Sequence, residues 1–379
     1  MNIIGIVCEY NPFHLGHLYQ LKKVKEMYPD SIIIVVCSSN FTQRGDVSIL
    51  NKWDKTRIAL DYGVDIFIEL PFGYATQSSD IFAKGAIELL NYLKIDTLVF
   101  GSESDNIKEL INLANIQLNN KDYNNIVKKY LDQGINYPTA LSKALTDITN
   151  TTINKPNDLL GLSYIKEIIK NNYKITPITI KRTNDYHGKD INNNIINASL
   201  IRKLLLEKKD ITNYIPSNTY KYLNPISLDD FYPYLKYQII NNYNKLNIYQ
   251  TVDEGIENRI IKSIYKTYNY NELVTNIKTK RYTYNKINRM LLHILTNFTK
   301  EEAQNIKIDY IRLLGFTSSG QRYLNSIKKD ITIPIITRYK PKISNLLDLE
   351  FRTNSIYAHI TNNYKLIELE YNCKPIIKN

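Results

Sequence analysis

Four runs of consecutive apolar residues lie near the start of the chain, and stretches with apolar residues at helical spacing separate them. The runs occupy residues 2–10, 31–39, 64–71 and 95–103. The helical stretches occupy residues 14–28, 51–63 and 78–94. Continuous apolar strands that alternate with amphipathic helices are typical of a parallel sheet covered on both faces. We therefore expect an α/β, Rossmann-like fold whose ligands bind beyond the carboxyl ends of the strands.

The pattern changes farther along the chain. The helical pattern of residues 105–155 predicts an inserted helical segment, after which the α/β alternation resumes with a helix at 154–171, a strand and loop at 174–188 and a helix at 197–209. Beyond a linker near 210–225 most stretches have helical periodicity, including residues 308–329, and the best strand candidate is 331–338. The sequence thus predicts a catalytic domain over residues 1–220 and a mainly α-helical domain over residues 226–379.

Composition narrows the class of protein. Of the 379 residues 43% are hydrophobic, and no apolar run reaches the roughly 18 residues that a membrane span needs. The chain starts with a strand-like run instead of a signal peptide, and its three cysteines cannot form a disulfide framework. Cys8 and Cys37 are expected to be small buried hydrophobes. We therefore expect no membrane association and a cytoplasmic location.

The chain is basic, with a net charge of +12 and a pI near 9.2. Its lysines and arginines are spread along the whole sequence, so the charge belongs to a folded surface. Such a surface favours a polyanionic partner, nucleic acid above all. The abundance of Asn, Lys, Ile and Tyr is also what translation of an AT-rich genome produces, so composition by itself leaves both explanations open.

Two of the five histidines, His14 and His17, stand three residues apart where the first strand gives way to a helix. A helix N-terminus attracts phosphate, and residues three apart share a face, so both imidazoles can donate hydrogen bonds to one anionic group. Gly16 removes a side chain and admits a flat base or ribose. Two alternatives stay open: ordinary surface or capping histidines, and metal ligands with Cys8 as a third. No dinucleotide-binding glycine motif and no Walker loop accompany them.

A family resemblance rests on these residues. His14-Leu15-Gly16-His17 resembles the HxGH signature of the adenylyl-transferring superfamily, which nucleotidyltransferases share with class I aminoacyl-tRNA synthetases. The second motif of that superfamily, Ile-Ser-(Ser/Ala)-Thr-x-Ile-Arg, is similar to "INASLIR" at residues 196–202. Here Ser199 lies at a predicted helix start, with Asn197 or Ser199 as its cap, and Arg202 lies one turn in, which suits an anionic ligand.

A wider match involves "GIVCEYNPFHLGH", "SSNFTQRGD", "VFGSE", "NKPNDLLGLSYIK", "IKRTNDYH" and "YIRLLGFTSSGQRYL". Together these segments closely resemble the tRNA(Met) cytidine acetate ligase family over essentially the whole chain. The resemblance implies that acetate is activated with ATP to acetyl-adenylate and passed to N4 of the wobble cytidine of elongator tRNA(Met), giving N4-acetylcytidine. The chain departs from the family pattern at Ser39, where glycine is usual, and at Asn51, where aspartate is usual.

The resemblance also implies a set of site residues. The expected catalytic residues are His14, His17, Ser199 and Arg202. The expected ATP-binding residues are Val7, Cys8, Glu9, Tyr10, Asn11, Pro12, Phe13, His14, Leu15, Gly16, His17, Leu18, Tyr19, Gln20, Gly101, Asn157 and Arg182. Arg44 is a candidate for holding a carboxylate or an RNA phosphate, and Glu103 and Asp105 are either ligands of magnesium or ribose or simply solvated. ATP is expected as a substrate with Mg²⁺, and acetate and elongator tRNA(Met) as partners.

Two rival functions come from different classes. The first is a small-molecule adenylyltransferase of the same superfamily, which would need neither the large helical C-terminal domain nor the +12 charge. The second is a non-catalytic RNA-binding protein on a nucleotidyltransferase fold. The intact histidines, Gly16 and "INASLIR" argue against a decayed site, although retained motifs do not prove turnover.

Overall fold

The structure is a computed structural model that describes residues 1–182 and 195–379. The loop predicted after residue 182 therefore lies outside the described residues. The strands are β1 (Ile3–Cys8), β2 (Ile32–Ser38), β3 (Ile66–Leu70), β4 (Thr97–Ser102), β5 (Thr176–Lys181), β6 (Ile311–Thr317), β7 (Ile335–Ile336) and β8 (Ile376–Lys378).

Helices alternate with the first five strands, as the sequence predicts. They are α1 (Leu15–Met27), α2 (Lys52–Asp61), α3 (Phe72–Ala75), α4 (Ser79–Tyr92), α5 (Ile107–Asn119), α6 (Tyr123–Asp132), α7 (Tyr137–Thr149), α8 (Pro156–Lys170) and α9 (Ala198–Leu206). The remaining helices are α10 (Leu228–Asn241), α11 (Ile256–Ile264), α12 (Tyr270–Ile277), α13 (Tyr284–Leu295), α14 (Lys300–Asn305), α15 (Ser318–Ile327), α16 (Asn345–Ile360) and α17 (Lys365–Asn372).

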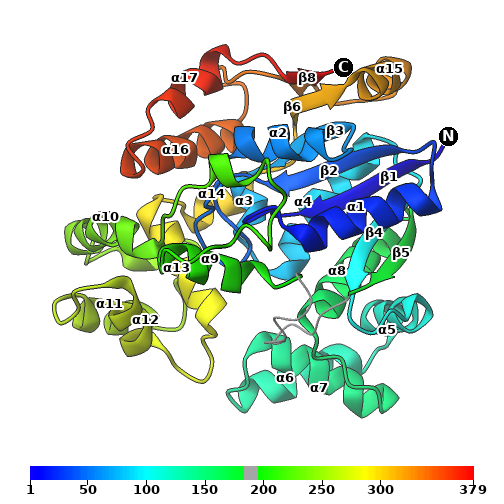
Figure 1. Cartoon of the computed structure of the whole chain (residues 1–379). Coiled ribbons are helices and arrows are strands. Elements are labelled where there is room, and N and C mark those ends of the chain that lie inside the picture. The colour runs from blue at the N-terminus through cyan, green and yellow to red at the C-terminus, as the bar shows by residue number, and fades with distance from the viewer. Residues whose placement is uncertain (183–194) are drawn as a thin grey trace.

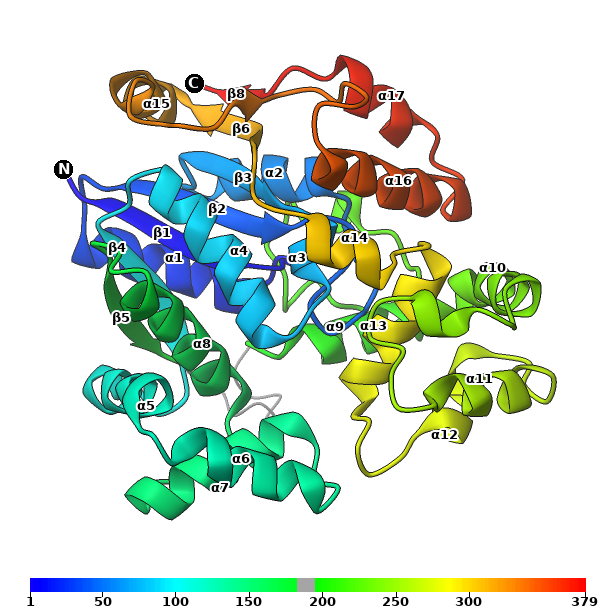
Figure 2. The same cartoon turned by 180° about the vertical axis from the view of Figure 1, so that it is seen from behind.

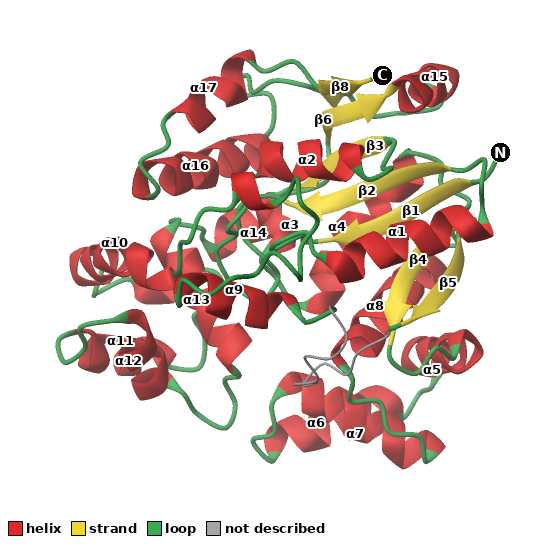
Figure 3. Ribbon diagram, viewed as in Figure 1, coloured by secondary structure: helices red, strands yellow, loops and turns green. Residues whose placement is uncertain are grey.

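The sheet has the order β5-β4-β1-β2-β3-β6-β7, with β8 paired to β6. The strands β1 to β5 are parallel, and the chain runs from β1 through β2 and β3 to one side before it returns to β4 on the other. This reversal makes a topological switch point between β1 and β4, which is where open α/β sheets bind their ligands. The expected Rossmann-like, α/β fold is confirmed (Figure 3).

Alternate residues of the strands pack on opposite faces of the sheet. On β2, Ile33 and Val35 belong to the core cluster that includes residues of α1 and α2, whereas Ile34 and Val36 belong to the cluster that includes α4 and α8. The helix α1 covers one face in Figure 1, and α4 crosses the other face in Figure 2. The sheet is therefore covered on both sides, which is why its strands read as continuous apolar runs.

One sequence prediction is wrong. The segment 308–329 has helical periodicity, but residues Ile311–Thr317 form β6, which pairs antiparallel with β3, and only the following residues form α15. Six of the seven residues of β6 are buried, so burial on both faces erases the period-2 alternation that marks a half-buried strand. The predicted strand at 331–338 shrinks to Ile335–Ile336. The sheet thus contains strands from both predicted domains, and the division at residues 220–226 stays a prediction.

The inserted helices and the helices of the C-terminal part form two separate groups beside the sheet. The inserted helices α5 to α7 lie at the lower right of Figure 1, and α10 to α13 lie at the lower left. Within the ranges 1–182 and 195–379, no helix combines the length and the apolar character needed to span a bilayer.

Candidate active site

A cavity of about 420 Å³ lies at the carboxyl ends of β1, β4 and β5. The loop after β1, the start of α1, the loop 42–46, the start of α8 and the start of α9 complete its wall. The predicted residues that line it are Val7, Cys8, Glu9, Tyr10, Asn11, His14, Gly16, His17, Tyr19, Gln20, Arg44, Gly101, Asn157, Arg182, Ser199 and Arg202. Residues far apart in sequence thus meet at the switch point of the sheet.

His14 and His17 form the N-terminal cap of α1. The ring nitrogen Nδ1 of His14 accepts a hydrogen bond from the Gly16 backbone N–H at 3.0 Å, and Nδ1 of His17 accepts one from the His14 N–H at 3.3 Å. The two rings lie 3.9 Å apart between centroids. A neutral imidazole that accepts at Nδ1 carries its proton on Nε2, so each ring has one N–H left to donate. The capping role is therefore observed, and it is compatible with the predicted anion binding.

Burial keeps both imidazoles neutral. Burial, together with the positive charges of Arg182 and Arg202, lowers the pKa of His14 to about 3. Burial likewise lowers the pKa of His17 well below its usual value, helped by His14, Arg182 and Lys55. The rings are therefore hydrogen-bond donors at neutral pH without being cations. A neutral donor can stabilise the negative charge that develops in a transition state, and it binds anions in the ground state less tightly than a cation would.

Gly16 has a steric role that the sequence did not reveal. A Cβ at residue 16 would lie 2.7 Å from Cε1 and 3.0 Å from Nδ1 of the His14 ring. The glycine therefore leaves room for the imidazole to fold back over its own helix. The Tyr10 ring meets the His17 ring edge-on at 4.8 Å, which helps to hold the second imidazole.

The second motif joins the loops around the cavity. Asn197 is the residue that caps α9, its side chain accepting from the Leu200 N–H. Arg202 donates from Nη1 to the Asn11 carbonyl at 2.7 Å and from Nη2 to the Asp46 carboxylate at 2.5 Å. Ser199 lies 3.5 Å from the same guanidinium. Arg202 thus ties the loop after β1 to the loop 42–46.

The third side of the cavity is made by the ends of β4 and β5. A Cβ at Gly101 would lie 3.3 Å from Cγ of Arg182, so the glycine leaves space for that arginine side chain to lie across β4. Asn157 lies in the first turn of α8, where its amide donates to Glu103 at 2.6 Å. Burial lowers the pKa of Arg182 while the charge of Glu103 raises it.

The two acids considered for magnesium or ribose have structural partners. The Glu103 carboxylate also accepts from the backbone N–H groups of Asn157 and Asp158, both at 3.1 Å, so it caps α8. Asp105 accepts from the Thr179 hydroxyl at 2.7 Å. Neither is simply solvated. Within the described ranges, no group of three or more His, Cys, Asp or Glu side chains is arranged to hold a metal ion.

Several predicted residues do not line the cavity, namely Pro12, Phe13, Leu15 and Leu18. Phe13 is fully buried and stacks on Tyr62 at 5.5 Å between centroids. The Leu15 N–H donates to the Tyr214 carbonyl at 3.1 Å. These residues hold the loop in place. Cys8 and Cys37 are buried as expected, and burial raises the pKa of the Cys8 thiol.

Sequence reasoning missed three residues that support the site. Lys55 is fully buried and donates from Nζ to the Ser38 and Ser39 carbonyls at 2.9 and 2.6 Å, at the end of β2. Gln43 donates its backbone N–H to Glu9 at 2.6 Å. Asp158 accepts from the Ser102 hydroxyl at 2.5 Å. Nothing in the amphipathic pattern of its helix marks Lys55 as a site residue. Gln43 and Asp158, in contrast, directly adjoin the predicted site residues Arg44 and Asn157.

The two departures from the family pattern have local explanations. The Ser39 hydroxyl donates to the buried Glu350 carboxylate at 2.6 Å. The Asn51 side chain caps α2 by accepting from the Trp53 and Asp54 N–H groups at 3.0 and 3.1 Å, as an aspartate would. Neither residue lines the cavity.

The loop 42–46 lies directly against α13. Gly45 has a φ of +74°, and a Cβ there would lie 2.4 Å from the Arg289 backbone nitrogen. Arg289 in turn donates from Nη1 to the Gln43 carbonyl at 2.9 Å. Burial lowers the pKa of Arg289 to about 10. This close approach brings the loop that carries Asp46, which follows β2, to the edge of the helical region.

Comparisons with known proteins agree with this geometry. A family model described as HIGH nucleotidyl transferase matches residues 1–371. The tRNA(Met) cytidine acetate ligase of Geobacillus sp. (strain WCH70) is 40% identical over 365 residues, covering 91% of this chain and 90% of the relative. That of Thermoanaerobacter sp. (strain X514) is 38% identical over 402 residues and covers 100% of both chains. That of Bacillus subtilis (strain 168) is 36% identical over 382 residues, with coverage of 94% and 92%.

Solved structures extend the likeness to three dimensions. Apo Thermotoga maritima TmcAL superposes with a TM-score of 0.91 at 28% identity, covering 100% of this chain and 99% of that one. The same protein bound with alpha-thio ATP gives a TM-score of 0.90, with the same identity and coverage. With a family model over nearly the whole chain and relatives near 40% identity, the chain belongs to the tRNA(Met) cytidine acetate ligase family of HIGH nucleotidyl transferases, a family of ligases.

Proposed function

We propose that this protein activates acetate with ATP to acetyl-adenylate and transfers the acetyl group to N4 of the wobble cytidine of elongator tRNA(Met). The observation that carries the proposal is the pair of neutral imidazoles at the start of α1, each with Nε2–H left to donate, facing a cavity that Arg182 and Arg202 also line. The names of the relatives support acetate as the acid and tRNA(Met) as the RNA. The analogue bound to TmcAL supports ATP as the nucleotide.

In the first step an acetate oxygen attacks the α-phosphorus of ATP, and the bond from that phosphorus to the bridging oxygen breaks as pyrophosphate leaves. Negative charge grows on the phosphoryl oxygens and on the leaving group. His14 and His17 donate from Nε2 to this charge, and the start of α1 adds its positive dipole end. Arg182 neutralises the departing phosphates. The protein supplies positioning and electrostatics and no covalent nucleophile.

In the second step the cytidine N4 attacks the acetyl carbon, the bond from that carbon to the phosphate oxygen breaks, and AMP leaves while N4 loses a proton. A base within a stem or stacked loop does not reach a recessed carbonyl, so the target base must be extruded toward the cavity. We assign Arg44, which lines this cavity, to acetate or to an RNA phosphate. Ser199 and Arg202 support the phosphate from α9.

Magnesium stays a prediction. The Glu9, Asp46 and Glu103 carboxylates around the cavity each accept a hydrogen bond from the protein, as described above. They do not form a cage of free oxygens. A magnesium ion usually keeps several waters and binds through substrate phosphates, so we expect it to arrive with ATP. No step of the proposed reaction is assigned to it.

The test is an incubation with ATP, radiolabelled acetate and total tRNA, followed by nucleoside analysis. We expect label in N4-acetylcytidine of the methionine elongator and acetate-dependent ATP–pyrophosphate exchange without RNA. Exchange with a different acid and no labelled RNA would identify a small-molecule adenylyltransferase. Tight tRNA binding with neither activity would identify a non-catalytic RNA-binding protein. Either of these results contradicts the proposed function.

A further inference from the structure

A second cavity, of about 300 Å³, lies between the starts of α10, α12 and α13. Asp46 lines both this cavity and the one at the switch point, so the two share a wall. The contact between Gly45 and the α13 backbone holds that wall in place. Whatever occupies the second cavity therefore lies next to the site where the proposed adenylate forms.

The second cavity differs chemically from the first. Its described lining residues include two acids, Asp46 and Asp229, and none is basic. Phosphate is therefore a poor occupant. The volume is at the lower end of the roughly 300–1,000 Å³ typical of small-molecule sites. This size suits one nucleobase with its sugar better than a dinucleotide.

The polar groups of the cavity are oriented by their neighbours. The Tyr270 hydroxyl donates to Oδ1 of Asn288 at 3.1 Å, and the Tyr270 N–H donates to Asp229 at 2.8 Å. Because Oδ1 of Asn288 accepts from the tyrosine, its amide nitrogen is the group left to donate into the cavity. The cavity therefore presents an amide donor at Asn288 and an acceptor at Asp46, where Oδ2 already accepts from Arg202 and Oδ1 is the oxygen left to accept.

This arrangement is complementary to the pairing edge of cytosine. Cytosine carries an amine donor at N4 beside acceptors at N3 and O2, and carboxylates accept from N4 in known complexes. Uracil has an acceptor at position 4 and a donor at N3, so it would set an oxygen against the Asp46 carboxylate. An unmatched buried polar pair is costly, and such mismatches discriminate strongly between similar ligands.

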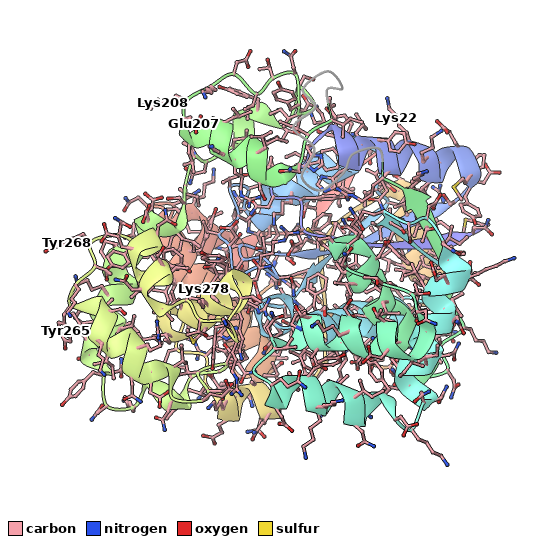
Figure 4. The ribbon with its side chains drawn as sticks, turned by 90° about the horizontal axis from the view of Figure 1, so that it is seen from below. Lys22, Glu207, Lys208, Tyr265, Tyr268 and Lys278 are labelled. Carbon is pink, nitrogen blue, oxygen red and sulfur yellow. The ribbon has the colours of Figure 1, made fainter. Side chains whose placement is uncertain are left out.

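The rim of the cavity suits single-stranded RNA. Tyr284, which lines the cavity, is 57% exposed, so its ring can stack on a base. The segment Lys278–Lys286 carries four basic residues and no acid, and the Lys278 ammonium lies 5.3 Å from the Tyr284 ring centroid. In Figure 4, Lys278 lies near the middle of the view, whereas Tyr265 and Tyr268 lie at its left margin. The Lys278 cation therefore lies beside a tyrosine of the cavity lining, where the RNA backbone would pass.

We infer that the second cavity binds the target cytosine of the RNA, with its N4 amine directed at Asp46 and its N3 and O2 side toward the Asn288 amide. This inference rests on the proposed function and adds the subsite that the RNA base occupies. It also makes Asn288 a specificity-determining residue, since its donor distinguishes cytosine from uracil.

Photo-cross-linking tests the location directly. A stem-loop RNA with the methionine anticodon and 5-iodocytosine at the wobble position is irradiated with the full-length protein, and the modified peptide is sequenced. We expect the cross-link at residues that line the second cavity, within 227–229 or 270–288. A cross-link confined to segments that do not line this cavity overturns the inference.

Kinetics of two matched variants test the chemistry. Asn288→Asp replaces the donor with an acceptor, and we expect kcat/KM for tRNA acetylation to fall by about tenfold or more. Asn276→Asp adds the same charge to α12 at an exposed residue that does not line the cavity, and should stay within about twofold of wild type. Equal losses in both variants would overturn the inference.

Acetate-dependent ATP–pyrophosphate exchange involves no RNA, so it distinguishes a failure of the proposed function from a failure of the inference about the second cavity. Its absence in the wild-type protein contradicts the proposed function. If exchange is normal in wild type but Asn288→Asp loses exchange and acetylation in parallel, Asn288 is required for the folded structure as a whole. This result overturns the inference but not the proposed function. Retained exchange with reduced acetylation is the expected result.

Discussion

The two cavities that meet at Asp46 are lined by different kinds of polar residue, which suit different occupants. The cavity at the switch point is lined by Arg44, Arg182 and Arg202 together with both motif histidines. The second is lined by acids, amides and tyrosines, with cations only near its mouth. The first suits a polyphosphate and the second suits a base. Their separation matches a reaction in which an adenylate forms in one place and an amine approaches from another.

The difference also lies in how each cavity is built. The histidine cap is local, because four consecutive residues, 14–17, supply both rings and the glycine that makes room for them. The second cavity has no such motif, since its wall joins a loop after β2 to three helices more than 180 residues away. A variant that acts on one cavity alone can therefore separate the two chemical steps.

The largest expected effect is confined to the first cavity. His17→Ala removes one of the two neutral donors, so acetate-dependent ATP–pyrophosphate exchange should fall by about 100- to 1,000-fold. Binding of tRNA, measured by fluorescence anisotropy, should persist. His359→Ala is the matched control, because His359 lies on α16 outside both cavities. Normal exchange by His17→Ala would show that the imidazole is not part of the site.

A substitution in the shared wall should affect both cavities. Gly45→Ala places a Cβ 2.4 Å from the α13 backbone at a positive φ, so we expect a loss of about 1–3 kcal/mol in the free energy of unfolding. Exchange and acetylation should both decline as Asp46 shifts. Gly63→Ala, at another positive-φ glycine but with no atom within 4 Å of the added Cβ, provides the control for backbone strain alone. Equal behaviour of the two variants would refute the role assigned to the close contact.

The neutral imidazoles also predict a pH dependence. Burial lowers the folded-state pKa of His14 to about 3 and that of His17 well below 6.5, so the unfolded chain binds protons more readily. Their contribution to stability is complete above pH 6.5 and is lost as the pH falls toward the folded-state values. Between pH 7 and pH 5 we expect a loss of about 2 kcal/mol from His14, and a further loss of the same sign from His17.

Urea titrations at pH 7 and pH 5 measure this loss. His293 is buried as well, with a pKa lowered to about 4, and adds a similar contribution from outside the two cavities. The double variant His14→Gln, His17→Gln should therefore show a flatter dependence without abolishing it. An unchanged slope in the double variant would mean that the two rings titrate normally in the folded protein.

The smallest expected effect sharpens the assignment of the second cavity. Tyr284→Phe keeps the ring and removes only the hydroxyl, so the KM for tRNA should stay within about twofold of wild type, because stacking requires only the aromatic face. Tyr284→Ala removes the ring and should raise that KM about fivefold or more. A large effect of the phenylalanine variant in steady-state acetylation assays would favour a hydrogen bond from the hydroxyl over stacking.

Much of the fold is predictable because its signals are local. The runs at β1 to β4 are continuous since both faces of the sheet are covered, and α1 and α2 are capped by the residues that directly precede them, His14 and Asn51. β6 is the exception: it has no local signature distinct from a buried helix, and only its pairing with β3 defines it as a strand. Lys55 is similar, because its buried contacts with the Ser38 and Ser39 carbonyls cannot be read from helical spacing.

The sequence by itself determined the parallel α/β core, the position of the two histidines at a helix start and the matching second motif. These features follow from periodicity and from residues that are neighbours along the chain. Only the tertiary structure decided that Arg182 and Arg202 line the same cavity as the two imidazoles, that Arg202 bridges Asn11 and Asp46, and that Asp46 belongs to two cavities. The physical reason is that hydrogen-bond partners and desolvation come from segments far away in sequence, which meet only when the sheet and the helices pack.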